Sequence, residues 1–304
     1  MKKALLLGIA GSFFFAFTFL LNRSMNLSGG NWIWSASLRY LFMLPLLALL
    51  VRRRYPLKHV HRIIRKSPGY WLLWSTVGFG LFYAPLTYAG DYGESWLIAA
   101  SWQMTIVMGL LLSPFFRQRI PFMNLLASAL ILLGVFLLQF HRLSGTDLRL
   151  TLFTLLPILI AAISYPLGNR KMMALENTGL STLDRTYGMT LCSLPFWIML
   201  SVWGLFQEGL PSAGQAFQSL LVALFSGVAA TLLFFKATDL VKNNHCRLAV
   251  IESTQSGEVL FTLLGGIWFL RDPSPDSMGF LGIFLIISGM IWNSCQSGIS
   301  RKKE

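Results

Sequence analysis

The chain has 304 residues, of which 55% are hydrophobic and 12% are charged, and its mean hydropathy is +0.61. Because about a quarter of the residues in a soluble domain are charged, this composition excludes an ordinary soluble enzyme or binding domain and indicates a polytopic membrane protein. The net charge of +13 does not indicate nucleic-acid binding, since the basic residues are spread over many loops instead of one soluble face.

Ten runs of about 20 mostly apolar residues follow one another along the chain, and each is long enough to cross a bilayer as a helix. None alternates with a period of two, so helices are predicted and not the strands of an outer-membrane barrel. The first run is expected to be an uncleaved span, because its end lacks a small-x-small cleavage site. The ten predicted spans are 4–21, 32–51, 70–90, 94–114, 121–140, 151–169, 186–204, 216–238, 248–270 and 276–295.

The basic residues between these spans predict the orientation of the chain. With the amino terminus placed in the cytoplasm, 20 of the 25 Lys and Arg residues fall on the cytoplasmic side, Arg39 falls inside a span, and only Arg23, Arg142, Arg149 and Arg271 fall on the other side. Cytoplasmic loops carry an excess of Lys and Arg. Both termini are therefore predicted to be cytoplasmic, in a multi-pass protein of the inner (plasma) membrane.

Two short patterns recur about half a chain length apart. The pattern N-R-x-M begins at Asn22 and again at Asn169, each time at the end of a predicted span. The triplet SWQ at 101–103 is matched by STQ at 253–255. Matches in the same order and at similar positions indicate an internal duplication.

The duplication predicts two repeats, residues 1–147 and 148–304, with five spans each. Because an odd number of crossings separates equivalent points, the two copies must have opposite orientations in the membrane, as in many secondary carriers. The fold class predicted is therefore an all-α integral membrane protein of ten transmembrane helices, arranged as two inverted five-helix repeats. In such proteins the substrate site lies near the midplane, between the repeats.

The run 248–270 carries two carboxylates, Glu252 and Glu258, among apolar residues. A charge near the bilayer centre costs about 2.5–3.5 kcal/mol on insertion scales, so such groups face a bundle interior or a wet cavity. Glu258 lies about ten residues into the run and thus near the midplane, whereas Glu252 lies nearer one face. Either they form a structural pair or they belong to the transport path, where both are the candidate proton-coupling residues.

Arg39 lies eight positions into its predicted span and needs a partner. One possibility is a salt bridge with a carboxylate of the run 248–270, and depth favours Glu258 over Glu252. The other is capture of an anionic group of the substrate.

Polar and aromatic side chains within the spans complete the predicted site. The amides and hydroxyls can bind a polar substrate, or equally well join helices. The aromatic rings can form a cage for an organic cation, with Phe13, Phe14, Phe15 and Phe17 as further members, although aromatic stripes in membrane helices more often serve packing. The predicted substrate-binding residues are Glu258, Gln255, Gln103, Trp102, Ser101, Thr254, Tyr83, Arg39, Tyr165 and Asn22.

Several stretches resemble one family of carriers. They are the first span closing on NRSM, the Arg39-Tyr40 pair in SASLRYLFMLP, SWQMTIVMGLLLSPFFRQRI, IESTQSGEVLFTLLGGIWFLRD and GFLGIFLIISGMIW. With them the whole chain resembles the ten-span carriers of the drug/metabolite transporter superfamily, in particular its multidrug resistance efflux branch. The resemblance implies a ten-helix bundle with a central cavity that exports small metabolites or lipophilic cations, often against a proton gradient. The four-span pumps of this superfamily use a glutamate in their first helix, but 4–21 contains no acid, so that role does not transfer by position.

We therefore expect a secondary active exporter of lipophilic or cationic compounds, with proton antiport as the candidate coupling mechanism. Export of amino acids or related metabolites is the alternative. No enzymatic activity is expected, because His141 and Asp147 form a lone pair without a nucleophile. A nucleotide-driven pump is disfavoured, because no G-x-x-x-x-G-K-[ST] loop is present. The spacing of the cysteines and histidines predicts no metal, and no cofactor is expected. The expected partners are the small-molecule substrate, protons and the lipid bilayer, without nucleic acid, for a monomer or homodimer.

Overall fold

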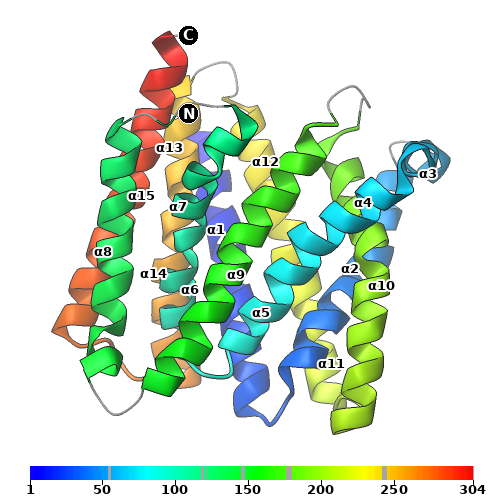
Figure 1. Cartoon of the computed structure of the whole chain (residues 1–304), viewed down its shortest axis with the longest axis horizontal. Helices are drawn as coiled ribbons and strands as arrows, with labels where there is room; N and C mark the ends of the chain where they lie inside the picture. Colours follow the sequence, from blue (N-terminus) through cyan, green and yellow to red (C-terminus); the bar gives the residue numbers. More distant parts are fainter. Residues whose placement is uncertain are drawn as a thin grey trace.

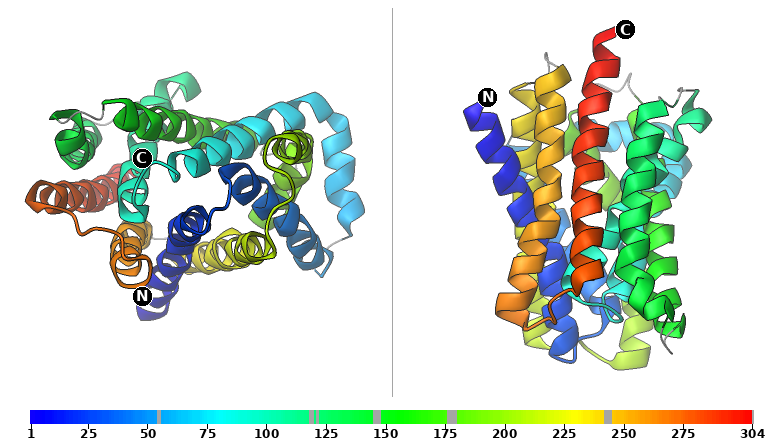
Figure 2. Two further views of the ribbon diagram at one scale, coloured as in Figure 1. Left: turned by 90° about the horizontal axis from the view of Figure 1, so that it is seen from below. Right: turned by 90° about the vertical axis from the view of Figure 1, so that its left-hand side faces the viewer.

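The structure, a computed structural model, describes residues 1–53, 56–117, 120, 122–144, 148–175, 180–241 and 245–303. Within these residues the chain forms helices and no strands, and the helices lie side by side in one bundle (Figure 1). The start of α1 (Lys2–Leu27) and the end of α15 (Ser277–Lys303) lie at the same end of the bundle (Figure 2). The all-helical class predicted from the sequence is confirmed.

Seven helices in the described part are long and apolar enough to cross a membrane, so the chain is a multi-pass membrane protein. Besides α1 and α15 they are α2 (Trp32–Arg52), α8 (Phe122–Ser144), α9 (Leu148–Met173), α10 (Thr182–Glu208) and the continuous helix Ala213–Asp239, composed of α11 (Ala213–Val222), the π-helical η4 (Ala223–Ala230) and α12 (Thr231–Asp239).

The other three predicted spans are also helical and, like Ala213–Asp239, each changes helix type or breaks along its length. The run 70–90 contains α4 (Pro68–Ser75), the π-helical η1 (Thr76–Gly80) and α5 (Leu81–Ala89). The run 94–114 contains α6 (Ser95–Trp102), α7 (Met104–Leu111) and the start of the 3₁₀ turn η2 (Ser113–Phe116). The run 248–270 belongs to α13 (His245–Ser253), the 3₁₀ turn η5 (Thr254–Ser256), α14 (Gly257–Gly265) and the π-helical η6 (Gly266–Leu270). A short helix, α3 (Leu57–Lys66), links α2 to α4.

Side chains satisfy the backbone at two of these interruptions. The side-chain amide of Gln103 donates to the carbonyl of Ala99 at 3.1 Å, where α6 ends. At η5, the hydroxyl of Thr254 donates to the carbonyl of Ile251 at 2.6 Å and that of Ser256 to Ser253 at 2.8 Å. Because lipid offers no hydrogen bonds, a broken helix at membrane depth requires such internal partners.

Glycines allow two pairs of helices to approach closely. A Cβ built on Gly168 of α9 would lie 2.3 Å from the Cα of Gly78 in η1, and one built on Gly134 of α8 would lie 2.6 Å from the carbonyl oxygen of Gly282 in α15. Small residues at such crossings let backbones pack directly, which is a principal source of helix association in membranes.

We expect Gly168→Ala to lower the stability of the folded protein by about 1–3 kcal/mol, because overpacked interiors must shift backbone to relieve a clash. The measurement is the melting temperature of the purified protein in detergent. Gly69→Ala is the matched control, since a Cβ at Gly69 meets no atom within 4 Å. Equal melting temperatures for the two variants would show that the contact between α9 and η1 does not constrain the bundle.

The long helices α1 and α9 occupy similar positions relative to their neighbours. Helix α1 packs against η4, α12 and α14, whereas α9 packs against η1, α5 and α7. Helix α2 packs against α10, and α8 packs along α15. In Figure 2, α8 and α15 lie together at one side of the bundle. Each half of the chain therefore packs extensively against the other.

Candidate functional site

Arg39 lies on α2 and is 8% exposed. Its guanidinium carbon stands 4.1 Å from the centre of the Tyr83 ring. Two of its nitrogens donate to the hydroxyls of Thr18 (3.4 Å) and Ser226 (3.3 Å), and these hydroxyls are hydrogen-bonded to each other. Its Nε has no hydrogen-bond partner. Arg39 is thus a buried cation that aromatic and hydroxyl groups surround, with its Nε left without a hydrogen-bond partner.

The aromatic partner of Arg39 is itself held in place. The side-chain amide of Asn22, from α1, donates to the hydroxyl of Tyr83 at 3.1 Å. Tyr40, next to Arg39, stacks on Trp197 of α10 with ring centres 4.5 Å apart. Arg39, Tyr83 and Asn22, which the sequence predicted as separate candidates, are therefore brought together.

Glu258 lies in the first turn of α14 and is half-buried. Among the described residues no side chain forms a hydrogen bond or salt bridge with its carboxylate, although Arg39 and Tyr165 are close enough to interact with it electrostatically. The predicted alternative of an Arg39–Glu258 salt bridge is therefore wrong. Physically, the guanidinium is held by the Tyr83 ring and by the hydroxyls of Thr18 and Ser226 instead.

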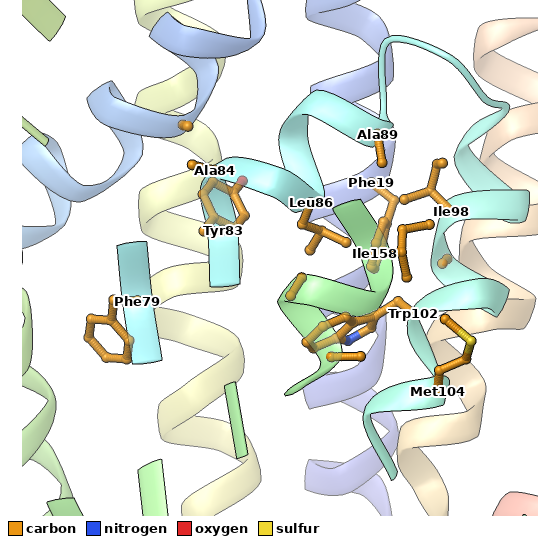
Figure 3. Packing of buried hydrophobic residues seen from close by; sticks show 14 of the residues in the cluster. Phe19, Phe79, Tyr83, Ala84, Leu86, Ala89, Ile98, Trp102, Met104 and Ile158 are labelled. Atoms are coloured by element: carbon orange, nitrogen blue, oxygen red, sulfur yellow. The ribbon is translucent and has the colours of Figure 1, made fainter. Parts of the chain in front are cut away.

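A second group of rings adjoins Tyr83. Phe82 lies 5.0 Å from Trp102 and 4.8 Å from Tyr165, measured between ring centres, and Trp102 lies 5.7 Å from Tyr165. Figure 3 shows Trp102 and Tyr83 among the buried side chains packed between the helices. Tyr165 is 39% exposed, so it marks the accessible border of this aromatic cluster.

The phenylalanines of α1 do not complete this cluster. Phe13, Phe14 and Phe17 contact one another and the rings of Phe225 and Phe261. Phe15 packs instead near Phe234. The single cage predicted from the sequence is therefore two separate clusters, because the α1 phenylalanines pack toward η4, α12 and α14.

Ser101, Gln103 and Thr254 make contacts that join helices or close helix breaks. The hydroxyl of Ser101 accepts from Gln139 of α8 at 3.3 Å. Gln103 bonds within its own helix. Thr254 lies against Gly8 of α1, where an added Cβ would be 2.6 Å from its hydroxyl. These contacts favour the inter-helix alternative for Ser101 and Thr254, whereas Gln103 closes the end of its own helix.

Glu252 and Gln255 are half-buried, at the end of α13 and in η5. Neither belongs to the contacts described around Arg39. Because a 3₁₀-helix such as η5 has 3.0 residues per turn, side chains three residues apart lie on the same side of it. The spacing of three residues between Glu252, Gln255 and Glu258 is therefore compatible with one shared side of this helix.

The sequence analysis missed the side chains that hold Arg39. Thr18 lies four residues before Asn22 and thus on the same helix face, a signal that was available. Ser226 and Trp197 come from the other half of the chain, and nothing in their local sequence marks them. Within the described residues, no three His, Cys, Asp or Glu side chains gather as a metal site.

Together, the membrane-length helices and the ionisable groups Arg39 and Glu258 between them define an integral membrane protein with charged side chains in its interior. The chain belongs to the family described as "EmrE: Putative multidrug resistance efflux transporter", whose model matches residues 2–299. This family is one of small-molecule efflux transporters within the drug/metabolite transporter superfamily, so the family resemblance seen in the sequence is confirmed.

The chain is also similar to two relatives and to one solved structure. The chain is 48% identical over 315 residues to "Uncharacterized protein YjlA" of Bacillus subtilis (strain 168), covering 99% of this chain and 97% of that protein. It is also 48% identical over 266 residues to a protein of Shouchella clausii described as "Uncharacterized 42.1 kDa protein in intracellular alkaline protease 3'region", covering 84% of this chain and 70% of that protein. A crystal structure titled "Crystal structure of protein" shares the fold, with a TM-score of 0.66 at 12% identity over 100% of this chain and 99% of the other.

Proposed function

We propose that this protein is a secondary active exporter of small lipophilic or cationic compounds in the inner membrane, working by proton antiport. The observation that carries the proposal is Glu258, an interior carboxylate without a hydrogen-bond or salt-bridge partner among the described residues. Ionisable groups within membrane helices are costly and usually mark an ion or substrate path. An unpartnered carboxylate is free to hold either a proton or a cation.

Exchange of a proton for a cation follows because both would bind to the same group, the Glu258 carboxylate. A cation that arrives beside Glu258 stabilises the charged carboxylate and displaces its proton, whereas a proton that arrives removes the charge that holds the cation. One site therefore cannot hold both, and their movements in opposite directions become coupled. The rings of Trp102, Phe82 and Tyr165 provide the apolar and aromatic surroundings that suit an organic cation.

An inverted repeat of ten membrane crossings would give this site two routes of access. The inverted repeat is supported by the corresponding contacts of the two halves. Helix α1 of the first half packs on η4, α12 and α14 of the second, and α9 of the second half packs on η1, α5 and α7 of the first. The matched triplets both fall at helix breaks, after α6 and at η5. Two further helix ends, 154 residues apart, close on an arginine with positive φ, Arg117 (58°) and Arg271 (55°). Rocking of the repeats would then expose the site to each side in turn.

The Nε of Arg39 favours a second class of substrate, compounds that carry a carboxylate. The unused Nε of Arg39 is suited to a carboxylate, because arginine binds carboxylates through several N–H groups. Amino acids and related metabolites, which carry both an amine and a carboxylate, would engage Arg39 and Glu258 together. Export of such compounds is the alternative function.

The test is flux through the purified protein in proteoliposomes, with and without a pH gradient. The probes are phenylalanine, its methyl ester, which lacks the carboxylate, and a quaternary ammonium compound. We expect gradient-driven movement of the methyl ester and the quaternary ammonium compound. Movement of phenylalanine alone would replace the leading substrate class with the alternative, and a panel in which nothing moves would contradict the transport proposal.

A further inference from the structure

A polar network joins the two halves of the chain at the end of the bundle opposite the termini. The Nε of Arg23, near the end of α1, donates to Oδ1 of Asp272 at 3.3 Å. The other carboxylate oxygen of Asp272 accepts from the backbone N–H of Ser95 at 3.0 Å and from its hydroxyl at 2.6 Å. The Asp272 side chain is 1% exposed. A buried carboxylate thus ties α1 and the start of α6 to the segment before α15.

A second branch of the network reaches the turn after α5. Arg23 also donates to the side-chain oxygen of Asn26 at 3.3 Å, and the amide of Asn26 donates to Oδ1 of Asp91 at 3.0 Å. Nearby, the indole N–H of Trp96 donates to the carbonyl of Pro273 at 3.0 Å. Three segments from distant parts of the sequence therefore share one set of bonds.

The predicted cytoplasmic termini would place this end of the bundle outside the cell. A hollow beneath the network is lined by Phe19, Asn22, Arg23, Leu86, Gly90, Gly93, Ser95 and Ile98. Two of these residues, Arg23 and Ser95, belong to the network. Asn22 is hydrogen-bonded to Tyr83, whose ring lies against the Arg39 guanidinium. The hollow is therefore lined both by residues of the network and by Asn22, a neighbour of the candidate site.

We propose that Arg23, Asp272 and Ser95, with Asn26 and Asp91, form an outer latch that closes the outward route in this conformation and breaks when the route opens. The inference rests on the proposed function, because it takes an outward route to exist. Its physical basis is that Asp272 belongs to the second half of the chain and its donors to the first. Any rocking that parts the halves at this end must break these bonds.

Asp91 makes the latch responsive to the pH outside. Burial raises the pKa of Asp91 to about 6 from an ordinary value of 3.8, against the opposing effects of the Asn26 bond and the Arg23 charge. The Asn26–Asp91 bond lies within the first half, so it is the water entering through the broken Asp272 bonds that would hydrate Asp91 and return it to its ordinary pKa. Protonation therefore favours the closed latch, and deprotonation above about pH 6 favours opening. Asn26 and Arg23 act on Asp91 directly, and Tyr88 lies close enough to sense its charge. The other titratable groups linked to these residues or next to them in the chain are Tyr92, Glu94, Arg149 and Asp272.

The latch is tested by labelling a cysteine in the hollow. The background has Cys192, Cys246 and Cys295 replaced by Ser, and Phe19→Cys, at a position 4% exposed, is labelled from outside by a membrane-impermeant maleimide in right-side-out vesicles. We expect Arg23→Gln and Asp272→Asn each to speed labelling at least fivefold. Glu208→Gln, which neutralises an exposed carboxylate at the same end of the bundle, is the matched control and should not change the rate.

The outcomes separate the latch from the transport proposal. Labelling rates within twofold of the parent in folded Arg23→Gln and Asp272→Asn variants would overturn the latch, even if the parent transports normally. Faster labelling without flux in the parent would leave the latch standing and contradict transport. Because Arg23 is partly exposed, Arg23→Gln retains a usable result if Asp272→Asn does not fold.

The pH dependence of the latch is measured as a ratio of two labelling rates. The labelling rate of Phe19→Cys, divided by that of Leu210→Cys, a position 82% exposed at the same end, removes the intrinsic pH dependence of the thiol. From the two pKa values, this ratio should rise roughly tenfold between pH 5 and pH 7. In Asp91→Asn the ratio should stay constant. A ratio that rises equally in both would exclude Asp91 as the responsive group.

Discussion

Glu258→Gln is expected to abolish proton-driven transport while leaving the protein folded. Glutamine retains the shape of the side chain but can neither carry a negative charge nor release a proton. Removal of one partner of a buried charge pair costs about 2–5 kcal/mol, which corresponds to a loss of about 30-fold or more in affinity for a cation. The measurement is pH-gradient-driven flux of phenylalanine methyl ester in proteoliposomes, at equal amounts of reconstituted protein.

Two further variants define the role of this residue. Glu208→Gln removes an exposed carboxylate and should transport as the parent does. Glu252→Gln tests the second predicted proton-coupling residue, which lies outside the contacts around Arg39, and should reduce flux less than Glu258→Gln. If Glu258→Gln retained gradient-driven flux, proton exchange at this carboxylate would be excluded and the transport proposal would stand without it.

Arg39→Gln is expected to separate the two substrate classes. It removes a buried positive charge that interacts with Glu258 but retains groups able to bond to Thr18 and Ser226. Flux of phenylalanine methyl ester should stay within about threefold of the parent. Any flux of phenylalanine should fall by about 30-fold or more, because its carboxylate loses a charged partner, a loss of about 2–5 kcal/mol.

The readout distinguishes substrate binding from packing. Arg39→Lys keeps the charge but loses the planar group that stacks on Tyr83 at 4.1 Å, so it should retain more phenylalanine flux than Arg39→Gln. Equal losses for phenylalanine and its ester, together with a lower melting temperature, would show that Arg39 holds α2 to its neighbours and does not select the substrate.

The predicted spans correspond closely to the helices, although four of them change helix type or break along their length. Apolar runs of 20 residues can satisfy their backbone in lipid only as helices, so their existence followed from length and composition. The π-helical turn of η1 lies where Gly78 meets Gly168 of α9. The sequence shows the glycines, but their partner lies about 90 residues away, so the interruption could not be predicted.

The candidate site was predicted in part. Arg39, Tyr83, Asn22, Trp102, Tyr165 and Glu258 were selected because polar or aromatic groups within apolar runs are conspicuous. Ser101, Gln103 and Thr254 were selected by the same signal and bond elsewhere. Polarity at membrane depth indicates that a side chain has an interior partner, without indicating which one.

The sequence by itself determined that this chain is helical, crosses a membrane several times and belongs to a family of efflux transporters. Each of these depends on local hydrophobicity or on recurring motifs. Only the tertiary structure decided that Arg39 meets Tyr83, Thr18 and Ser226, and that Arg23 meets Asp272, 249 residues away. The reason is physical: lipid and protein interior are both apolar, so the sequence of a membrane helix gives little indication of which face is buried or which helix covers it.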